Sequence, residues 1–206
     1  MAYDALPGSE LAAVVTYLEM NSPPAIEVPA STLGLQRMAD PTPGEYRELF
    51  QLVGAPWLWF SRLILDDDKL LAVIGDPDVD LYAVRDGNGR AVGMLELDFR
   101  EPGQCELAFV GLIPNLSGLG HGRWLLAEAV IRAWREGVSR VHVHTCSLDH
   151  PAALAAYRRA GFTPYKRAIE RFPDPRLLGI LPASSAPQIP LLGTDASAVP
   201  APDCCT

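Results

Sequence analysis

The chain has 206 residues, 49% of them hydrophobic and 20% charged, which is enough apolar material for one substantial core and favours one domain, or two at most. Its 17 basic and 25 acidic side chains give a formal net charge of −8 at pH 7, which argues against nucleic acid as the main partner. No apolar run approaches the length that spans a bilayer, and the N-terminal residues lack the basic segment of a signal peptide. The four cysteines form no CxxC pair and no disulfide framework, so we expect a cytoplasmic protein that does not bind a membrane.

The first third of the chain is predicted to contain an apolar segment, a strand and two helices. Residues 11–20 are apolar, but the stretch is too short for its periodicity to separate a strand from a helical turn. A proline-punctuated linker at 21–30 precedes an expected strand at 33–38. Helices are expected at 42–53, from its apolar spacing, and at 66–74, from the three aspartates that suit its positive N-terminal end.

The rest of the chain has clearer turn chemistry. The sequence DGNG at 86–89 joins two strand-like segments, 81–85 and 91–99, and predicts a β-hairpin. The further expected elements are a strand at 105–113, a helix at 123–136, a strand at 140–146, a helix that begins after a cap at Asp149 or His150 and ends at 160–161, and a closing strand or strands at 162–172. From residue 173 onward, proline, alanine and serine predominate without periodicity, which predicts a mobile tail.

This order of elements predicts a mixed α/β fold, with helices on both faces of one sheet. We expect an N-terminal extension at 1–32, a folded domain at 33–172 and the tail at 173–206.

The strongest local pattern is the turn between the strand at 105–113 and the helix that follows it. Gly118, Gly120 and Gly122 stand at alternate positions, which lets successive backbone N–H groups face one way at the positive end of a helix. Such a turn can hold a pyrophosphate. The alternative is a tight turn in which the glycines serve only the backbone geometry.

This turn resembles a known signature. Ile113-Pro114 followed by GLGHGRWLL is similar to the acyl-CoA-binding segment of the GNAT superfamily, Q/R-x-x-G-x-G/A. Gly120 and Gly122 match its two small residues, while Ser117 stands at the Gln/Arg position.

A second segment, HPAALAAYRRAGFTPY, is similar to the superfamily's second signature, N-x-x-A-x-x-x-Y-x-x-x-G-F. Ala153, Tyr157, Gly161 and Phe162 match it, and His150 replaces the asparagine. The resemblance covers about residues 81–172. The stretches WLWFSR and TCSLDHP also resemble an uncharacterised bacterial group of the superfamily.

The resemblance implies a central, mostly antiparallel sheet of the seven-strand type, splayed where the strands 105–113 and 140–146 part. It also implies acetyl-CoA as acyl donor, no metal, and a primary amine on a small molecule or peptide as acceptor. A homodimer is compatible with it. The donor-binding residues that it implies are Leu112, Ile113, Ser117, Gly118, Leu119, Gly120, His121, Gly122, Arg123 and His150.

Two residues are candidates for proton transfer. By resemblance, Tyr157 protonates the departing thiolate; the alternative is a core aromatic on an amphipathic helix. The resemblance also implies a general base, sometimes acting through water, from a carboxylate on the strand at 105–113, which makes Glu106 the candidate. Desolvation at the entrance of an apolar strand can raise the pKa of a glutamate toward the range useful for this role. Its alternative is a solvated charge at a strand end, and Glu96 and Asp98 are competing carboxylates.

Trp57, Trp59 and Arg62 lie in the segment that borders the acceptor site in the superfamily. Exposed indole rings can hold a cation, although two core tryptophans would fit the sequence equally. His142, His144 and Cys146 alternate along one strand, but no matched second pair supports a zinc site.

The leading hypothesis is therefore an acyl-CoA-dependent N-acyltransferase. The alternative is a non-catalytic acyl-CoA-binding sensor or interaction module, and a scaffold without any ligand is the third candidate.

Overall fold

The computed structural model describes residues 4–193. Its strands are β1 (Glu10–Met20), β2 (Gly34–Arg37), β3 (Val79–Arg85), β4 (Ala91–Asp98), β5 (Gln104–Leu112), β6 (Arg140–Cys146) and β7 (Thr163–Pro173). Its helices are α1 (Pro43–Gly54), α2 (Asp67–Ile74), α3 (His121–Ala133) and α4 (Ala153–Arg159), with two short 3-10 helices at Ala55–Trp57 and Pro114–Leu116. Within the described range, no helix is long and apolar enough to cross a membrane.

The seven strands of the described residues form one sheet in the order β2-β3-β4-β5-β6-β1-β7. Every neighbouring pair is antiparallel except β5 and β6, which run parallel. These two strands pair only where Gln104, Cys105 and Glu106 face residues 140–142, and they diverge beyond that point. The expected mostly antiparallel, splayed sheet is therefore confirmed.

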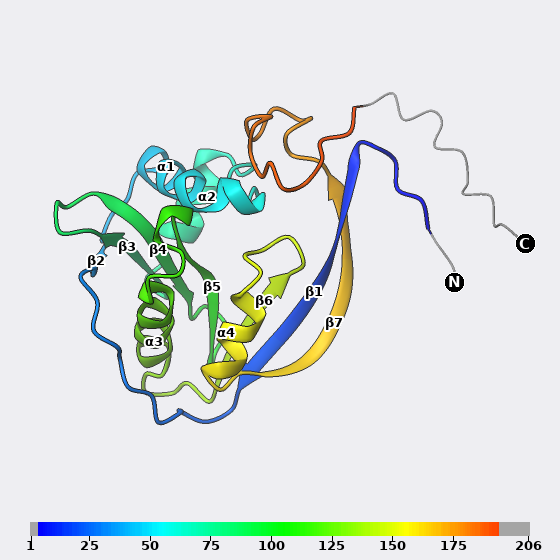
Figure 1. Ribbon diagram of the computed structural model, residues 1–206. Helices are drawn as coiled ribbons and strands as arrows, with labels where there is room; N and C mark the ends of the chain where they lie inside the picture. The colour runs from blue at the N-terminus through cyan, green and yellow to red at the C-terminus, as the bar shows by residue number, and fades with distance from the viewer. Residues whose placement is uncertain (1–3, 194–206) are drawn as a thin grey trace, which may run out of the picture.

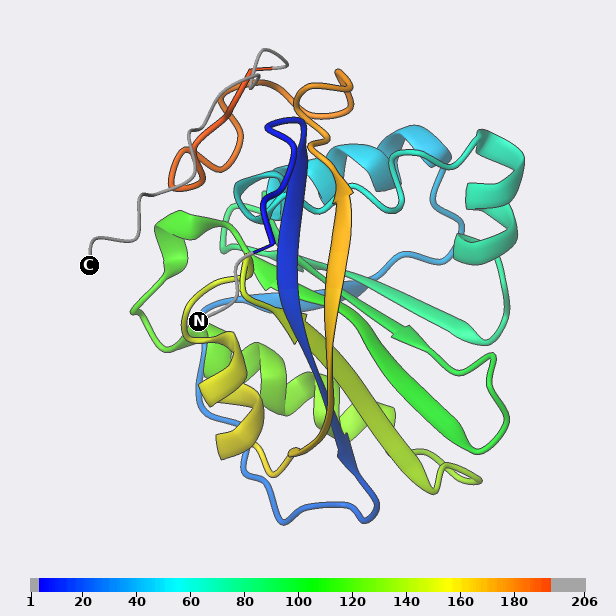
Figure 2. The same cartoon turned by 90° about the vertical axis from the view of Figure 1, so that its right-hand side faces the viewer.

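Strand β1 lies between β6 and the edge strand β7, and Figures 1 and 2 show it alongside β7. The expected N-terminal extension at 1–32 is thus wrong for residues 10–20, which lie inside the sheet. Leu18 and Met20 are buried on the side of α3. Ala13 and Val15 are also buried, and they stand at odd-numbered positions, out of phase with Leu18 and Met20. Because both faces of this strand carry apolar residues, its alternation is weak, and the sequence alone did not identify it as a strand.

Helices cover both faces of the sheet. On one face, α3 packs Leu125 and Val130 against Leu95 of β4 and Leu107 of β5. On the other face, α1 and α2 form a separate apolar cluster with β3 and β4. The two faces of the sheet therefore border different helices, α3 on one side and α1 and α2 on the other.

The chain does not leave the fold after β7. Arg176 and Asp174 form an ion pair in which both side chains are almost fully buried, at 1% and 2% exposure. Leu181 and Ala186 pack against Leu58, in the segment between α1 and α2. The expected mobile tail is therefore wrong for residues 174–189, because a buried ion pair and small apolar contacts hold this stretch without any aromatic anchor. Residues 194–206 of that expected tail lie outside the described part.

Candidate active site

A cavity of about 1440 Å³ opens where β5 and β6 diverge. It is lined by Leu125 and Tyr157 on the α3 side of the sheet and by Phe109 and His144 on the α1 side. The cavity therefore continues through the splay from one face to the other. Ligand pockets commonly measure roughly 300–1000 Å³, so this cavity has room for two ligands that meet in the plane of the sheet.

The glycine-rich turn borders the α3 end of the cavity. The φ angles of Gly118 and Gly120 are 80° and 84°, in the left-handed region that favours glycine. The backbone N–H groups of residues 118–122 donate to no acceptor among residues 4–193, and α3 begins at His121. Unused N–H groups at the positive end of a helix form an anion site. The turn therefore presents unused N–H groups that an anion could accept.

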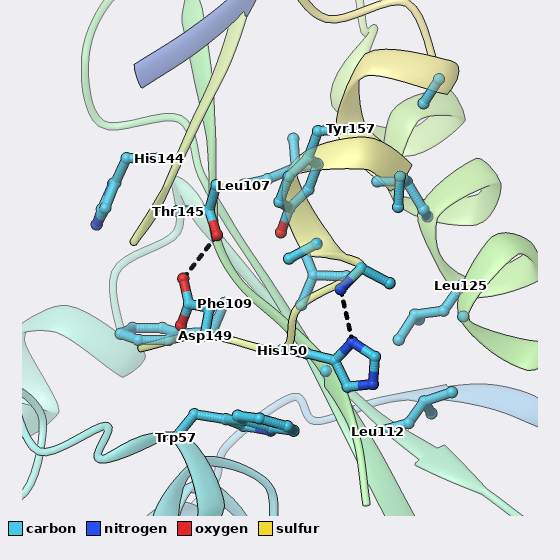
Figure 3. A pocket seen from close by; sticks show the side chains of 18 of the residues that line it. Trp57, Leu107, Phe109, Leu112, Leu125, His144, Thr145, Asp149, His150 and Tyr157 are labelled. Carbon is cyan, nitrogen blue, oxygen red and sulfur yellow. Dashed lines mark hydrogen bonds between the residues drawn. The ribbon is translucent and has the colours of Figure 1, made fainter. Parts of the chain in front are cut away.

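The two residues that depart from the superfamily signatures lie next to each other. Ser117 Oγ is 3.5 Å from Nε2 of His150, and the Trp57 ring meets the imidazole edge-on at 5.1 Å between centroids. The backbone N–H of Ala152 donates to Nδ1 of His150 at 3.1 Å (Figure 3). This bond places the proton of a neutral His150 on Nε2, which faces Ser117 and the glycine turn. His150 can therefore donate a hydrogen bond to an anion there.

Asp149 links the end of β6 to the segment between α1 and α2. Its carboxylate accepts hydrogen bonds from the hydroxyl of Thr145 and the N–H of Cys146, both at 2.7 Å, and from the indole N–H of Trp59 at 3.1 Å. The expected cap of α4 by Asp149 or His150 is wrong, because the N-cap is Ala152 and no side chain caps this helix. Asp149 instead fixes the loop after β6 to the segment between α1 and α2.

Tyr157 points from α4 into the cavity. Its ring packs edge-on against Phe162, at 5.8 Å, and its hydroxyl is directed toward the middle of the pocket (Figure 3). Within the described part of the chain, no hydrogen bond to this hydroxyl is present. Burial raises the pKa of Tyr157, and the negative charge of Asp149 raises it further, so the phenol keeps its proton at neutral pH. Tyr157 thus presents a protonated hydroxyl to the cavity.

Glu106 pairs with His144 of the neighbouring strand. Oε1 of Glu106 lies 3.1 Å from Nδ1 of His144, and both side chains line the cavity. This hydrogen bond lowers the pKa of Glu106 against the opposing effect of burial, and it raises the pKa of His144. The expectation that desolvation raises the pKa of Glu106 is therefore wrong, because a partner on β6 outweighs it.

The competing carboxylates on β4 are bound to other side chains. Glu96 is fully buried and accepts hydrogen bonds from the Tyr46 hydroxyl at 2.5 Å and from Arg62 at 2.6 Å. Asp98 forms an ion pair with Arg100. Neither carboxylate is available as a base. Arg62 lines the cavity, but its charge is compensated by Glu96.

The two tryptophans of the same segment differ in their surroundings. The Trp59 ring lies 5.9 Å from that of Phe50 and 5.2 Å from that of Phe109. It also packs against Gly54 and Gly111, where an added Cβ would lie 2.6 Å and 3.1 Å from Trp59 atoms. Trp59 is thus a packed wall of the cavity, as the core alternative has it, and Trp57 is the tryptophan beside His150.

His142, His144 and Cys146 do not assemble into a metal centre. Among residues 4–193, no group of three His, Cys, Asp or Glu side chains could hold a metal ion.

The sequence model of the acetyltransferase (GNAT) family matches residues 45–162, more than half of the chain. The chain belongs to this family.

Solved structures that resemble this GNAT chain support the fold assignment. One is a GCN5-related N-acetyltransferase from Sphaerobacter thermophilus, with 21% identity and a TM-score of 0.55, over 78% of this chain and 51% of that one. Another is a GCN5-related N-acetyltransferase from Kribbella flavida, with 21% identity and a TM-score of 0.52, over 80% of this chain and 60% of that one. An aminoglycoside acetyltransferase from an uncultured soil metagenomic sample, in complex with sisomicin, is also similar, with 18% identity and a TM-score of 0.53, over 68% of this chain and 93% of that one. The chain spans about half the length of the first of these structures. Among curated proteins, none matches the sequence.

Acetyltransferases of the GNAT family use acetyl-CoA as co-substrate. The residues at the α3 end of the cavity fit such a donor: the N–H groups of 118–122 are unused, and no atom lies within 4 Å of a Cβ built at Gly118, Gly120 or Gly122. Sequence reasoning found this turn and Tyr157 through local patterns. It missed the bridging role of Asp149 and the partner of Glu106, because both depend on residues from distant parts of the chain.

Proposed function

We propose that the chain transfers an acetyl group from acetyl-CoA directly to a primary amine, with Tyr157 as general acid. The observation that carries this proposal is the protonated, unbonded phenol of Tyr157 in a cavity whose α3 end is an anion site. An acyl donor held at that site would place its thioester near the splay, where the phenol points.

The donor would use three parts of the site. The backbone N–H groups of 118–122 would bind its pyrophosphate, with Ser117, Arg123 and the Nε2–H of His150 beside them. Leu112 and Ile113, at the end of β5, would border the pantetheine arm. Beyond Glu106, β5 no longer pairs with β6, so its backbone groups on that side can hydrogen-bond the amides of the arm.

The reaction would be a direct attack. The amine nitrogen would bond to the thioester carbonyl carbon, the carbon–sulfur bond would break, and the thiolate would take the proton of Tyr157. An acyl-enzyme on Cys146 is disfavoured, although this thiol lines the cavity, because burial raises its pKa to about 11 and keeps it protonated.

The α1 end of the cavity would hold the acceptor. Glu106 and Glu170 line it, while the charge of Arg62 is compensated by Glu96. The remaining negative charge favours a cationic amine. Trp57 would contribute an aromatic wall. Both small-molecule and peptide amines are compatible with this arrangement.

The test is thiol release from acetyl-CoA in the presence of a panel of small amines, amino acids and peptides. We expect turnover with at least one amine, and thermal stabilisation of the protein by CoA. Stabilisation without turnover would favour the alternative, a non-catalytic acyl-CoA-binding sensor or interaction module. A protein that CoA does not stabilise would contradict both.

A further inference from the structure

The α1 side of the splay carries a pair of side chains that could move a proton together. His144 of β6 donates through Nδ1 to Glu106 of β5, and the two residues line the part of the cavity assigned above to the acceptor. The imidazole is the more accessible member: its side chain is 50% exposed, against 31% for the carboxylate. A base must reach the proton that it removes, so exposure favours His144.

The tautomer of the imidazole also favours His144 as the base. Because Nδ1 carries the hydrogen donated to Glu106, a neutral His144 has its lone pair on Nε2. Among residues 4–193, no donor bonds to this nitrogen, which leaves it as the free acceptor of the pair. The oxygen Oε1 of Glu106, in contrast, is already occupied by the hydrogen bond that it accepts.

We propose that His144 is the general base, which takes the proton lost by the attacking amine, and that Glu106 is the residue that positions it. This inference rests on the proposed acetyl transfer. As the amine nitrogen bonds to the carbonyl carbon, its proton passes to Nε2 of His144. The thiolate that leaves on the other side of the sheet takes the proton of Tyr157, so one proton enters the protein and one leaves it. Solvent exchange then restores both groups.

Charged and titratable groups surround His144 from every packed element. They are Glu106 on β5, His142 on β6, Tyr17 on β1, Glu170 on β7 and Asp149 after β6. The bond to Glu106 raises the pKa of His144, burial opposes this effect, and the carboxylates of Asp149 and Glu170 add to it. Since the base acts in its neutral form, turnover should fall as the pH decreases through this raised pKa.

The experiment measures kcat and KM against pH for the full chain and three variants: His144→Gln, Glu106→Gln and His142→Gln. The acceptor chosen has an amine that is neutral over the whole pH range, so that its own titration does not contribute. His142→Gln is the matched control, because His142 lies on the same strand and the same face as His144 but does not line the cavity.

We expect His144→Gln to lower kcat by about 10²–10⁴-fold, to remove the acidic limb of the profile, and to leave the Kd of acetyl-CoA unchanged. Glu106→Gln should keep an acidic limb but move it to lower pH, because an amide still accepts the Nδ1 hydrogen without stabilising the imidazolium. His142→Gln should behave as the wild type.

Two results would overturn the assignment while leaving acetyl transfer intact. One is an acidic limb that persists in His144→Gln. The other is a loss of the limb in Glu106→Gln with His144→Gln close to wild type, which would make Glu106 itself the base. A wild-type protein that acetylates no amine would overturn the proposed function and this inference together.

Discussion

At the scale of single residues, Tyr157 offers a sharp test of chemistry. If its phenol protonates the departing thiolate, Tyr157→Phe should lower kcat by about 10²–10⁴-fold, equivalent to roughly 3–5 kcal/mol of barrier. The Kd of acetyl-CoA should change little, because within the described residues the hydroxyl makes no hydrogen bond that holds the site together. Steady-state kinetics and calorimetric binding measure the two quantities. Turnover within about threefold of wild type would remove Tyr157 from the reaction.

A substitution at Gly120 tests the proposed donor site. Gly120→Val should abolish CoA binding, because its side chain would occupy the space in front of the backbone N–H groups. The left-handed φ of 84° should also cost about 1–2 kcal/mol of stability.

Gly89, in the hairpin turn between β3 and β4, provides the control. Its φ is 79°, and a Cβ there would also meet no atom within 4 Å. Gly89→Val should therefore cost a similar amount of stability without affecting CoA binding. Equal loss of affinity in both folded variants would show that strain, and not the anion site, explains the effect at Gly120.

The candidate site was predictable where its chemistry is local in sequence. The alternate glycines and Tyr157 stand in short sequence patterns, and each pattern determines the local backbone conformation of its own residues. The direction of the pKa shift of Glu106 was not predictable, because the residue that reverses it, His144, lies on another strand. Asp149 was expected to cap a helix, since nothing in its neighbourhood indicates that Trp59 donates to it.

At the scale of elements, the segment at 174–189 packs against the segment between α1 and α2. The guanidinium of Arg176 bonds the Asp174 carboxylate and the carbonyls of Ser185, Ala186 and Ile189. Gln188 donates to the carbonyl of Pro56, next to the tryptophan segment. This segment therefore helps to fix one wall of the cavity.

Arg176→Leu should destabilise the protein by about 3–5 kcal/mol, because it leaves the carboxylate of Asp174 buried without a partner. The midpoint of urea denaturation measures this cost. Arg171→Leu is the control: its ion pair with Glu10 is exposed, at 51% and 33%, and should contribute at most about 1 kcal/mol. Similar midpoints for the two variants would mean that residues 174–189 contribute little to the folded state.

Most elements follow from sequence for identifiable reasons. A boundary is fixed locally by the capping box of Thr42 and Glu45, by the aspartates at the start of α2 and by the turn at 86–89. The position of β1 does not follow, because its partners are decided by the rest of the sheet. The segment at 174–189 lacks periodicity, and only its buried polar contacts distinguish it from an unstructured tail.

At the scale of the whole molecule, the order of elements was sufficient to predict one mixed sheet with helices on both faces. The splay followed from the family resemblance, and its physical basis is visible in the pairing of β5 and β6 over three residues only. The half of the cavity that we propose for the acceptor is lined by the sheet and by residues 57–62. Its shape depends on packing between distant elements, so no local pattern predicts it.

The place of β1 has a consequence for how the protein reaches this structure. Its register joins Val15 to Cys146 and Glu10 to Pro173, so the contacts of an early strand close loops of well over a hundred residues. During synthesis, β1 leaves the ribosome before both of its partners exist, and it must remain unpaired until β6 and β7 follow. Such a high contact order slows folding, and in the interval β1 and the edge of β6 are open to pairing with other chains. A newly synthesised chain can therefore complete its sheet only late, when β1 pairs with β6 and β7.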